Sequence, residues 1–195
     1  MGYVYHGSKT TGLKKLEPRV SPEQKKCVFA IKSKAVAAVL IGKAESIYYT
    51  LGGLGTPELP FYLIERLPGM FERIFNKSGS IYYLDDKNFK SAYLNWDAEL
   101  ISEQEEEVIY EERIENVLDK LNEYAESGEI LIYHYPNRPK NIPLDNSDLI
   151  PLIIKWHHQG IEKLVKEFLE LYPDLALRFY EELNKGKDKS NMTKK

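Results

Sequence analysis

The fold is decided first by the stretch Tyr3-Val4-Tyr5-His6-Gly7-Ser8 at the start of the chain. Aromatic and β-branched residues favour strands, so this stretch predicts a first strand. A polar loop, 9–26, follows, and the hydrophobic run 27–31 predicts a second strand. The first strand gives way to a loop just after a histidine and a glycine, and binding or catalytic residues often lie at such positions. His6 is therefore the first candidate site residue.

The bulk composition is that of a soluble globular protein with one well-buried core. The chain has 195 residues, of which 43% are hydrophobic and 29% charged. Its formal net charge is -3, so no general basic field attracts nucleic acid or an anionic membrane surface. The single cysteine, Cys27, excludes an internal disulfide. No apolar run is long enough to span a bilayer, and no basic-then-apolar leader begins the chain. We therefore predict a cytoplasmic protein with no nucleic acid or membrane partner; its oligomeric state stays open.

Strands and helices are expected to alternate along the chain, which indicates an α+β fold. Ser33 is a candidate N-cap for a helix over 33–42, and the run 80–84 predicts a mid-chain strand. The other predicted elements are a strand at 46–50, a helix at 61–76 interrupted near Pro68, strands at 99–102 and 108–111, a helix at 114–127 and a strand at 130–135. The acidic run 103–107 is interpreted as an exposed hairpin tip with hydrated charges.

The character of the sequence changes near residue 139. A proline-punctuated linker there is followed by helical patterns that break at Gly160 and Pro173. We expect a sheet domain over 1–139, a helical extension over 140–184 and a mobile, lysine-rich tail over 185–195.

Three short motifs resemble the opening of a known fold. Residues 5–11 read Tyr-His-Gly-Ser-Lys-Thr-Thr, and they are followed by Val28-Phe29-Ala30 and Ser33-Lys34-Ala35. This order resembles the ADP-ribosyltransferase fold of the poly(ADP-ribose) polymerases, the diphtheria-type toxins and the rifampin ADP-ribosyltransferases. The runs 79–84 and 99–111 also resemble later strands of the rifampin-modifying branch. The resemblance covers roughly residues 3–135 and implies a split β-sheet domain with a C-terminal helical appendage.

The resemblance also implies that NAD binds in a cleft between two halves of the sheet. The implied activity is ADP-ribosyl transfer or NAD glycohydrolysis, with the acceptor unidentified. His6 and Ser8 would contact the nucleotide, His6 by a hydrogen bond to a ribose, and the backbone of Gly7 would pair with the nicotinamide amide. Glycine suits that position because it lets a planar ligand approach the backbone closely. A carboxylate on a later strand would stabilise the cationic sugar that forms as nicotinamide leaves.

The sequence departs from the family pattern at its aromatic positions. Val28 stands where the family's second strand has a tyrosine, and the helix tyrosine of the polymerases would fall near Val39. Phe29 can stack on nicotinamide, and Tyr48 or Tyr49 could substitute if their segment folds back over the cleft. These departures favour an alternative function, a catalytically inactive domain that binds a nucleotide or a protein partner.

Glu99, which begins a predicted strand, is the first candidate for the catalytic carboxylate. Asp85 and Asp86, at the end of the strand 80–84, are the alternatives. Glu103 and Glu105 show the E-x-E spacing of arginine-modifying transferases, but within a glutamate-rich run that produces such spacings by chance.

Other partners are argued from what the sequence lacks. An RNA 2′-phosphotransferase on the same fold needs several arginines around a phosphate, and Arg19 is the only arginine in the first 65 residues. No Cys or His cluster has metal-ligand spacing, so we predict no metal site. Acceptor choice would lie in loops such as 52–60 and 87–98, whose sequences name no acceptor.

Overall fold

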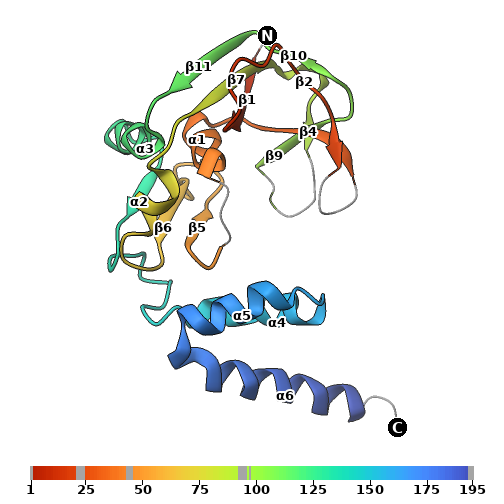
Figure 1. The fold of residues 1–195 in the computed structure, drawn as a ribbon, viewed down its shortest axis with the longest axis vertical. Helices are drawn as coiled ribbons and strands as arrows, with labels where there is room; N and C mark the ends of the chain where they lie inside the picture. The colour runs from red at the N-terminus through yellow and green to blue at the C-terminus, as the bar shows by residue number, and fades with distance from the viewer. Residues whose placement is uncertain (1, 21–24, 43–45, 92–95, 97, 193–195) are drawn as a thin grey trace. The chain divides into compact units, whose positions relative to one another are not determined.

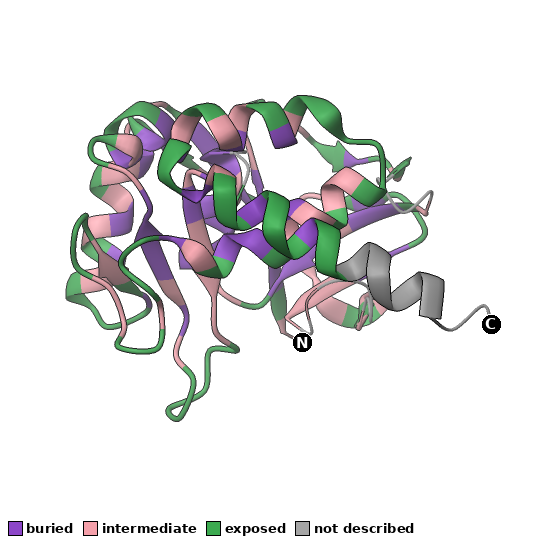
Figure 2. Cartoon of the chain, turned by 90° about the horizontal axis from the view of Figure 1, so that it is seen from below, coloured by how far each residue is buried: buried purple, intermediate pink, exposed green. Residues whose placement is uncertain are grey.

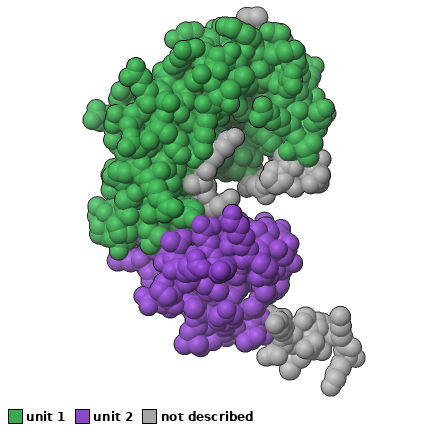
Figure 3. Space-filling model, in the orientation of Figure 1, with its two compact units in different colours: residues 1–137 green, residues 138–195 purple. Residues whose placement is uncertain are grey.

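The structure is a computed structural model and describes residues 2–20, 25–42, 46–91, 96 and 98–192 (Figure 1). The described strands and helices confirm the predicted α+β class. The chain divides into two compact units, residues 1–137 and residues 138–195 (Figure 3). Parts of three predicted segments lie outside the described residues, namely 21–24 of the first loop, 92–95 and 97 of the loop 87–98, and 193–195 of the tail.

The large sheet of the first unit is organised around its first strand, which lies between two antiparallel neighbours. In spatial order its strands are β11 (Tyr110–Ile114), β7 (Gly79–Asp85), β1 (Tyr3–Ser8), β4 (Lys26–Ile31), β9 (Glu99–Ser102) and β8 (Lys90–Ser91), with β3 (Arg19–Val20) paired to β4 outside this path. Four predicted strands, at 3–8, 27–31, 80–84 and 99–102, are confirmed, and the one predicted at 108–111 begins two residues later.

A second sheet has three strands. β6 (Tyr62–Glu65) pairs antiparallel with β5 (Tyr49–Gly52) and parallel with β12 (Leu131–Tyr133). The strand predicted at 46–50 is therefore shifted toward β5, and the one predicted at 130–135 is shorter. A separate short pair joins β2 (Lys15–Leu16) to β10 (Glu106–Glu107).

The helix predicted over 61–76 is wrong in its first half. Residues 62–65 form the central strand β6, and only α2 (Met70–Phe75) is helical. Leu63 and Ile64 are both fully buried, so the run is apolar on both faces and carries no strand alternation in the sequence. Pro68 and Gly69 end the extended segment, and Gly69 adopts a positive φ of 73° immediately before the helix.

Helix α1 (Lys34–Gly42) lies between the large sheet and the second sheet (Figure 1). The predicted N-cap is confirmed, because the Ser33 hydroxyl accepts a hydrogen bond from the Val36 amide at 3.3 Å. Its alanines and valines are buried, and such small side chains allow close packing on both sides. Figure 2 colours the chain by how far each residue is buried. A Cβ on Gly7 would lie 1.8 Å from the Ala37 carbonyl oxygen. Gly7 therefore lets α1 contact β1 directly.

The acidic run 103–107 is not uniformly hydrated. Glu106 is only 4% exposed, and its carboxylate accepts hydrogen bonds from the Ser102 hydroxyl and from the Asn88 amide. Its neighbours do lie at the surface, where Glu103 pairs with Lys90 at 3.0 Å. The predicted hairpin tip is thus wrong at Glu106, because the pairing of β10 with β2 turns that side chain inward.

Helix α3 (Val117–Glu126) begins later than the predicted 114–127, because Ile114 still belongs to β11. Asn116 caps the helix by accepting hydrogen bonds from the next turn.

The second unit, described by itself, is helical. It contains α4 (Ile150–His158), α5 (Glu162–Leu171) and α6 (Ala176–Met192), and the predicted breaks at Gly160 and Pro173 are confirmed. The backbone of α6 continues into the lysine-rich segment, and the mobility of that segment stays a prediction. Across the described residues, every helix is too short or too polar to cross a membrane.

Candidate functional site

His6 lies where β1 and β4 stop pairing. Among the described residues, the registered partners on these two strands are Tyr5 and Ile31. One residue further along β1, the Nδ1 atom of His6 lies 2.7 Å from the carbonyl oxygen of Phe29. A carbonyl can only accept, so this contact assigns a proton to Nδ1, and Nε2 of the neutral ring is then an acceptor. The ring orientation is therefore set by the backbone of the neighbouring strand.

A cavity of about 600 Å³, here called the His6 cavity, lies beside this contact. Its lining includes His6 and Ser8 from β1, the segment 12–17, Arg19 from β3 and the segment 27–29 of β4. Among the described lining residues three are basic and one is acidic, namely Lys14, Lys15, Arg19 and Glu17. Lys15 also pairs with Glu105, outside the lining, at 2.8 Å. The described lining of the cavity therefore combines hydroxyl and imidazole groups with more basic than acidic residues.

Strand register places the candidate residues on two faces of the large sheet. Side chains alternate between faces along a strand, and directly paired residues share a face. Tyr5 pairs with Ile31, and Ile31 pairs with Glu99, so Glu99 lies on the face that α1 covers. His6 lies on the other face, which it shares with its partner Tyr82. The structure therefore does not bring His6 and Glu99 to one face.

The alternative carboxylates lie at the opposite end of β1 from His6. Asp85 pairs with Tyr3, and its carboxylate accepts the amide hydrogen of Lys87 at 3.0 Å. Asp86 follows it and accepts from the amide of Gly2 at 3.3 Å. His6 is three positions after Tyr3, which along an extended strand is a distance of roughly 10 Å. Both aspartates have local partners that account for their positions.

The aromatic residues predicted to stack on nicotinamide also lie in different parts of the structure. Phe29 lines the His6 cavity together with Val28, whose side chain is also part of a buried apolar cluster. Tyr49 is instead only 7% exposed in the second sheet, where its ring packs 5.4 Å from that of Phe75. Tyr49 therefore does not line the His6 cavity, whereas Phe29 is among its described lining residues. Because Phe29 pairs with Ile101, strand alternation puts its side chain on the face of the sheet that carries Glu99.

Sequence reasoning missed Glu111, which fixes one wall of the His6 cavity. Its Oε1 atom accepts the Gly12 amide hydrogen at 2.7 Å and the Ser80 hydroxyl hydrogen at 2.7 Å. The Tyr82 hydroxyl lies 3.3 Å from the same oxygen, donates to the carbonyl oxygen of Thr10 and accepts from the amide of Leu13. Glu111 and Tyr82 thus attach residues 10–13 to the sheet face that carries His6.

Hydrogen bonding also sets the charge state of this wall. The hydrogen bonds from the Gly12 amide and the Ser80 hydroxyl hold the pKa of the Glu111 carboxyl below its usual range. Burial, the largest cause, raises the pKa of the Tyr82 hydroxyl, so Tyr82 stays a neutral donor at physiological pH. Glu111 is therefore an ionised acceptor, and one of its oxygens accepts from both the Gly12 amide and the Ser80 hydroxyl.

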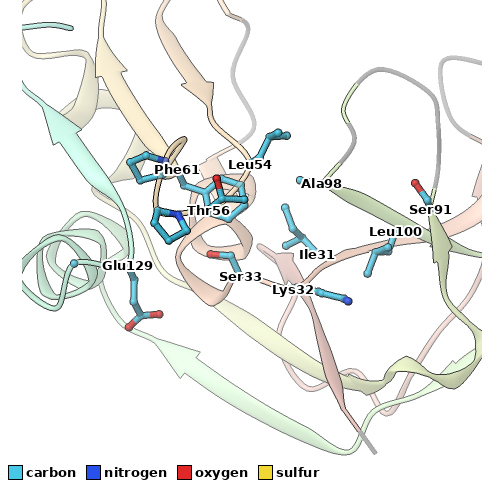
Figure 4. Close-up of a pocket in the computed structure, with 14 residues that line it drawn as sticks. Ile31, Lys32, Ser33, Leu54, Thr56, Phe61, Ser91, Ala98, Leu100 and Glu129 are labelled. Atoms are coloured by element: carbon cyan, nitrogen blue, oxygen red, sulfur yellow. The ribbon is translucent and has the colours of Figure 1, made fainter.

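A second cavity, of about 680 Å³, lies at the end of β4 and is here called the Leu54 cavity (Figure 4). It is lined by Ile31 and Ser33, by the segment after β5, and by Ala98 and Leu100. The two cavities share none of their described lining residues. Glu99 is not among the described lining residues of the Leu54 cavity, although its pairing partner Ile31 and its neighbours Ala98 and Leu100 are.

The described residues contain no group of three or more His, Cys, Asp or Glu side chains that could hold a metal ion. No protein-family model matches the chain, and no curated protein or solved structure matches it either. The function is therefore argued from the two cavities alone.

Proposed function

We propose that residues 1–137 form a nucleotide-binding domain of the ADP-ribosyltransferase class, with the His6 cavity as the site for NAD. The observation that carries the proposal is the composition of that cavity. Phe29 lines the cavity, His6 and Ser8 offer partners for ribose hydroxyls, and Lys14 and Arg19 offer charge for a pyrophosphate. Ribose hydroxyls and a pyrophosphate are the polar parts of a dinucleotide.

Binding without turnover is the function that the geometry supports best. In a transferase, the bond between nicotinamide and C1′ of the ribose breaks, and nicotinamide leaves with the electron pair. The resulting ribosyl cation is captured by water or by an acceptor nucleophile, which loses a proton. An ionised carboxylate beside the sugar must stabilise that cation. Glu99 is on the face opposite His6, and Val28 supplies no hydroxyl, so neither completes the His6 cavity as a catalytic site.

Catalysis is the second candidate function, and its support is that Glu99 lies next to the lining of the Leu54 cavity. Its neighbours Ala98 and Leu100 line a cavity large enough for a nucleoside. A dinucleotide bound in the His6 cavity could extend past the end of β4. Its nicotinamide ribose would then lie on the face of the sheet that carries Glu99. This candidate needs both His6 and Glu99, whereas binding alone needs only His6.

Calorimetric titration with NAD at low salt, combined with measurement of released nicotinamide, tests both candidates. We expect saturable binding that is lost in His6→Ala and kept in Glu99→Gln. Nicotinamide release that disappears in Glu99→Gln but persists in Glu103→Gln, a surface carboxylate of the same segment, would establish the enzyme. Absence of NAD and ADP-ribose binding by the wild-type protein would end the proposal.

A further inference from the structure

The Leu54 cavity is a second candidate site, and its construction differs from that of the His6 cavity. One wall is the segment between β5 and β6, with Leu54, Thr56 and Phe61. The facing wall is the β8–β9 side, with Ala98 and Leu100 (Figure 4). Its volume of about 680 Å³ falls in the range of small-molecule sites.

The first wall is built by its own hydrogen bonds. The amides of Leu54 and Gly55 donate to the carbonyl oxygen of Leu59 at 2.9 and 3.1 Å, and the Leu59 amide donates back to the carbonyl oxygen of Thr56 at 3.1 Å. Gly55 has a positive φ of 73°, and a Cβ there would lie 2.3 Å from the Phe61 ring. Only glycine allows this turn to close over Phe61.

Phe61 is fixed from its other side too. Its ring packs edge-on against Trp96 with 5.7 Å between centroids, and the Trp96 indole nitrogen donates to the carbonyl oxygen of Gly53 at 3.0 Å. The wall is therefore formed before any ligand arrives, which lowers the ordering cost of binding.

This wall keeps apolar surface exposed. Leu54 and Leu59 belong to the same turn and are 45% and 44% exposed, but only Leu54 lines the cavity. A leucine held at a cavity mouth gains free energy when a ligand removes it from water. Leu59, with nearly equal exposure, serves as an internal comparison.

The charges of the Leu54 cavity select against nucleotides. Among its described lining residues one is basic, Lys32, and one is acidic, Glu129, so these carry no excess of either sign. The remaining lining is apolar or bears hydroxyl groups, as in Ser33 and Thr56. The described lining therefore offers no net attraction for phosphate, and its surface is polar and apolar in nearly equal parts, so apolar contact and hydrogen bonding both contribute affinity.

We propose that the Leu54 cavity binds an uncharged small molecule with a flat or elongated apolar body. The body lies between Leu54 and Leu100, and hydroxyl or amide groups on the ligand meet Ser33 and Thr56. This site is distinct from the nucleotide site and does not depend on the nucleotide proposal.

The test uses the full chain and the uncharged fluorescent probe N-phenyl-1-naphthylamine, whose emission rises in apolar surroundings. We expect saturable binding of one probe per chain. Leu54→Asp should weaken binding about tenfold or more, because a carboxylate must then lose water against the probe. Leu59→Asp should leave the affinity within about twofold of the wild-type value.

Ala98→Trp provides an independent check, since it fills the cavity rather than charging it, and it should abolish saturable binding. Circular dichroism must show that each variant unfolds at the wild-type temperature. Equal losses in Leu54→Asp and Leu59→Asp would overturn the proposal, as would non-saturable binding by the wild-type protein. Displacement of the probe by NAD would also overturn it, because the two sites would then not be separate.

Discussion

The two cavities of the first unit differ far more in charge than in size. Both use β4, the His6 cavity at residues 27–29 and the Leu54 cavity at Ile31, and their volumes are about 600 and 680 Å³. Among the described lining residues, the first has three basic residues against one acidic residue, whereas the second has one of each. Because the two volumes are so similar, cavity volume does not distinguish the ligand of one cavity from that of the other. The comparison teaches that the side chains supplied by neighbouring loops, rather than the shared strand, decide which ligand each cavity takes.

The largest expected effect removes both cavities at once. Gly7→Ala places a Cβ 1.8 Å from the Ala37 carbonyl oxygen, and backbone of α1 must move to relieve the overlap. We expect the free energy of unfolding to fall by about 3 kcal/mol, with loss of NAD and probe binding together. Urea unfolding measures the first effect. A loss below about 1 kcal/mol would contradict the close packing of α1 on β1.

A smaller effect should separate the two cavities. Glu111→Ala removes the acceptor of the Gly12 amide and the Ser80 hydroxyl, and we expect unfolding to become easier by about 2 kcal/mol. NAD binding should weaken because the 10–13 wall loosens, whereas probe binding should not change. Glu115→Ala, an exposed glutamate just past the same strand, is the matched control and should cost less than about 0.5 kcal/mol. If Glu111→Ala weakened the binding of NAD and of the probe equally, the two cavities would not be independent sites.

The charge difference itself predicts a third, smaller effect. Lys14→Ala and Arg19→Ala should each weaken NAD binding by up to about fivefold at low salt, and added salt should reduce the difference. Lys9→Ala, an exposed lysine outside the lining, should leave NAD affinity unchanged. Calorimetry at two salt concentrations measures this. Equal effects from Lys9 and Arg19 would mean that general surface charge, not the cavity, attracts the nucleotide.

The smallest effect is on the pH dependence of stability. The Glu111 pKa is lower in the folded protein than the ordinary value of 4.5, so the folded state favours the ionised form. Its contribution is fully present above pH 4.5 and is lost as the pH falls through the lower, folded value. Glu111→Gln should therefore flatten the fall of stability below pH 4.5. An unchanged acid profile in that variant would assign the acid sensitivity to other carboxyls.

The elements that could be predicted from sequence are those with a local signal. The strand 3–8 has its β-branched and aromatic pattern, and α1 has its Ser33 cap and alanines. β6 has no such signal, because Leu63, Ile64 and Glu65 are all buried and show no alternation. The strand owes its conformation to β5 and to β12, which is almost seventy residues further along the chain. A pairing of that range leaves no trace in a single sequence.

The candidate site was predictable only in part for the same reason. His6, Ser8 and Phe29 belong to strands with clear local patterns, and the structure places all three at one cavity. Glu111 contacts Gly12 across 99 positions, and its sequence neighbours, Glu112 and Arg113, give it no distinguishing feature. Glu99 was placed in the correct strand, but its face depends on the register of β4 with β1, which the sequence does not encode locally.

The most direct test is an NMR titration of the isotope-labelled full chain with NAD. The account predicts saturable amide shifts that gather on residues 6–20 and 27–29, around the His6 cavity. The amide signals of residues that line the Leu54 cavity, such as Leu54, Thr56 and Ser91, should not shift. Shifts that gather on the Leu54 cavity, or no saturable shifts anywhere, would contradict the central claim that charge assigns the nucleotide to the His6 cavity.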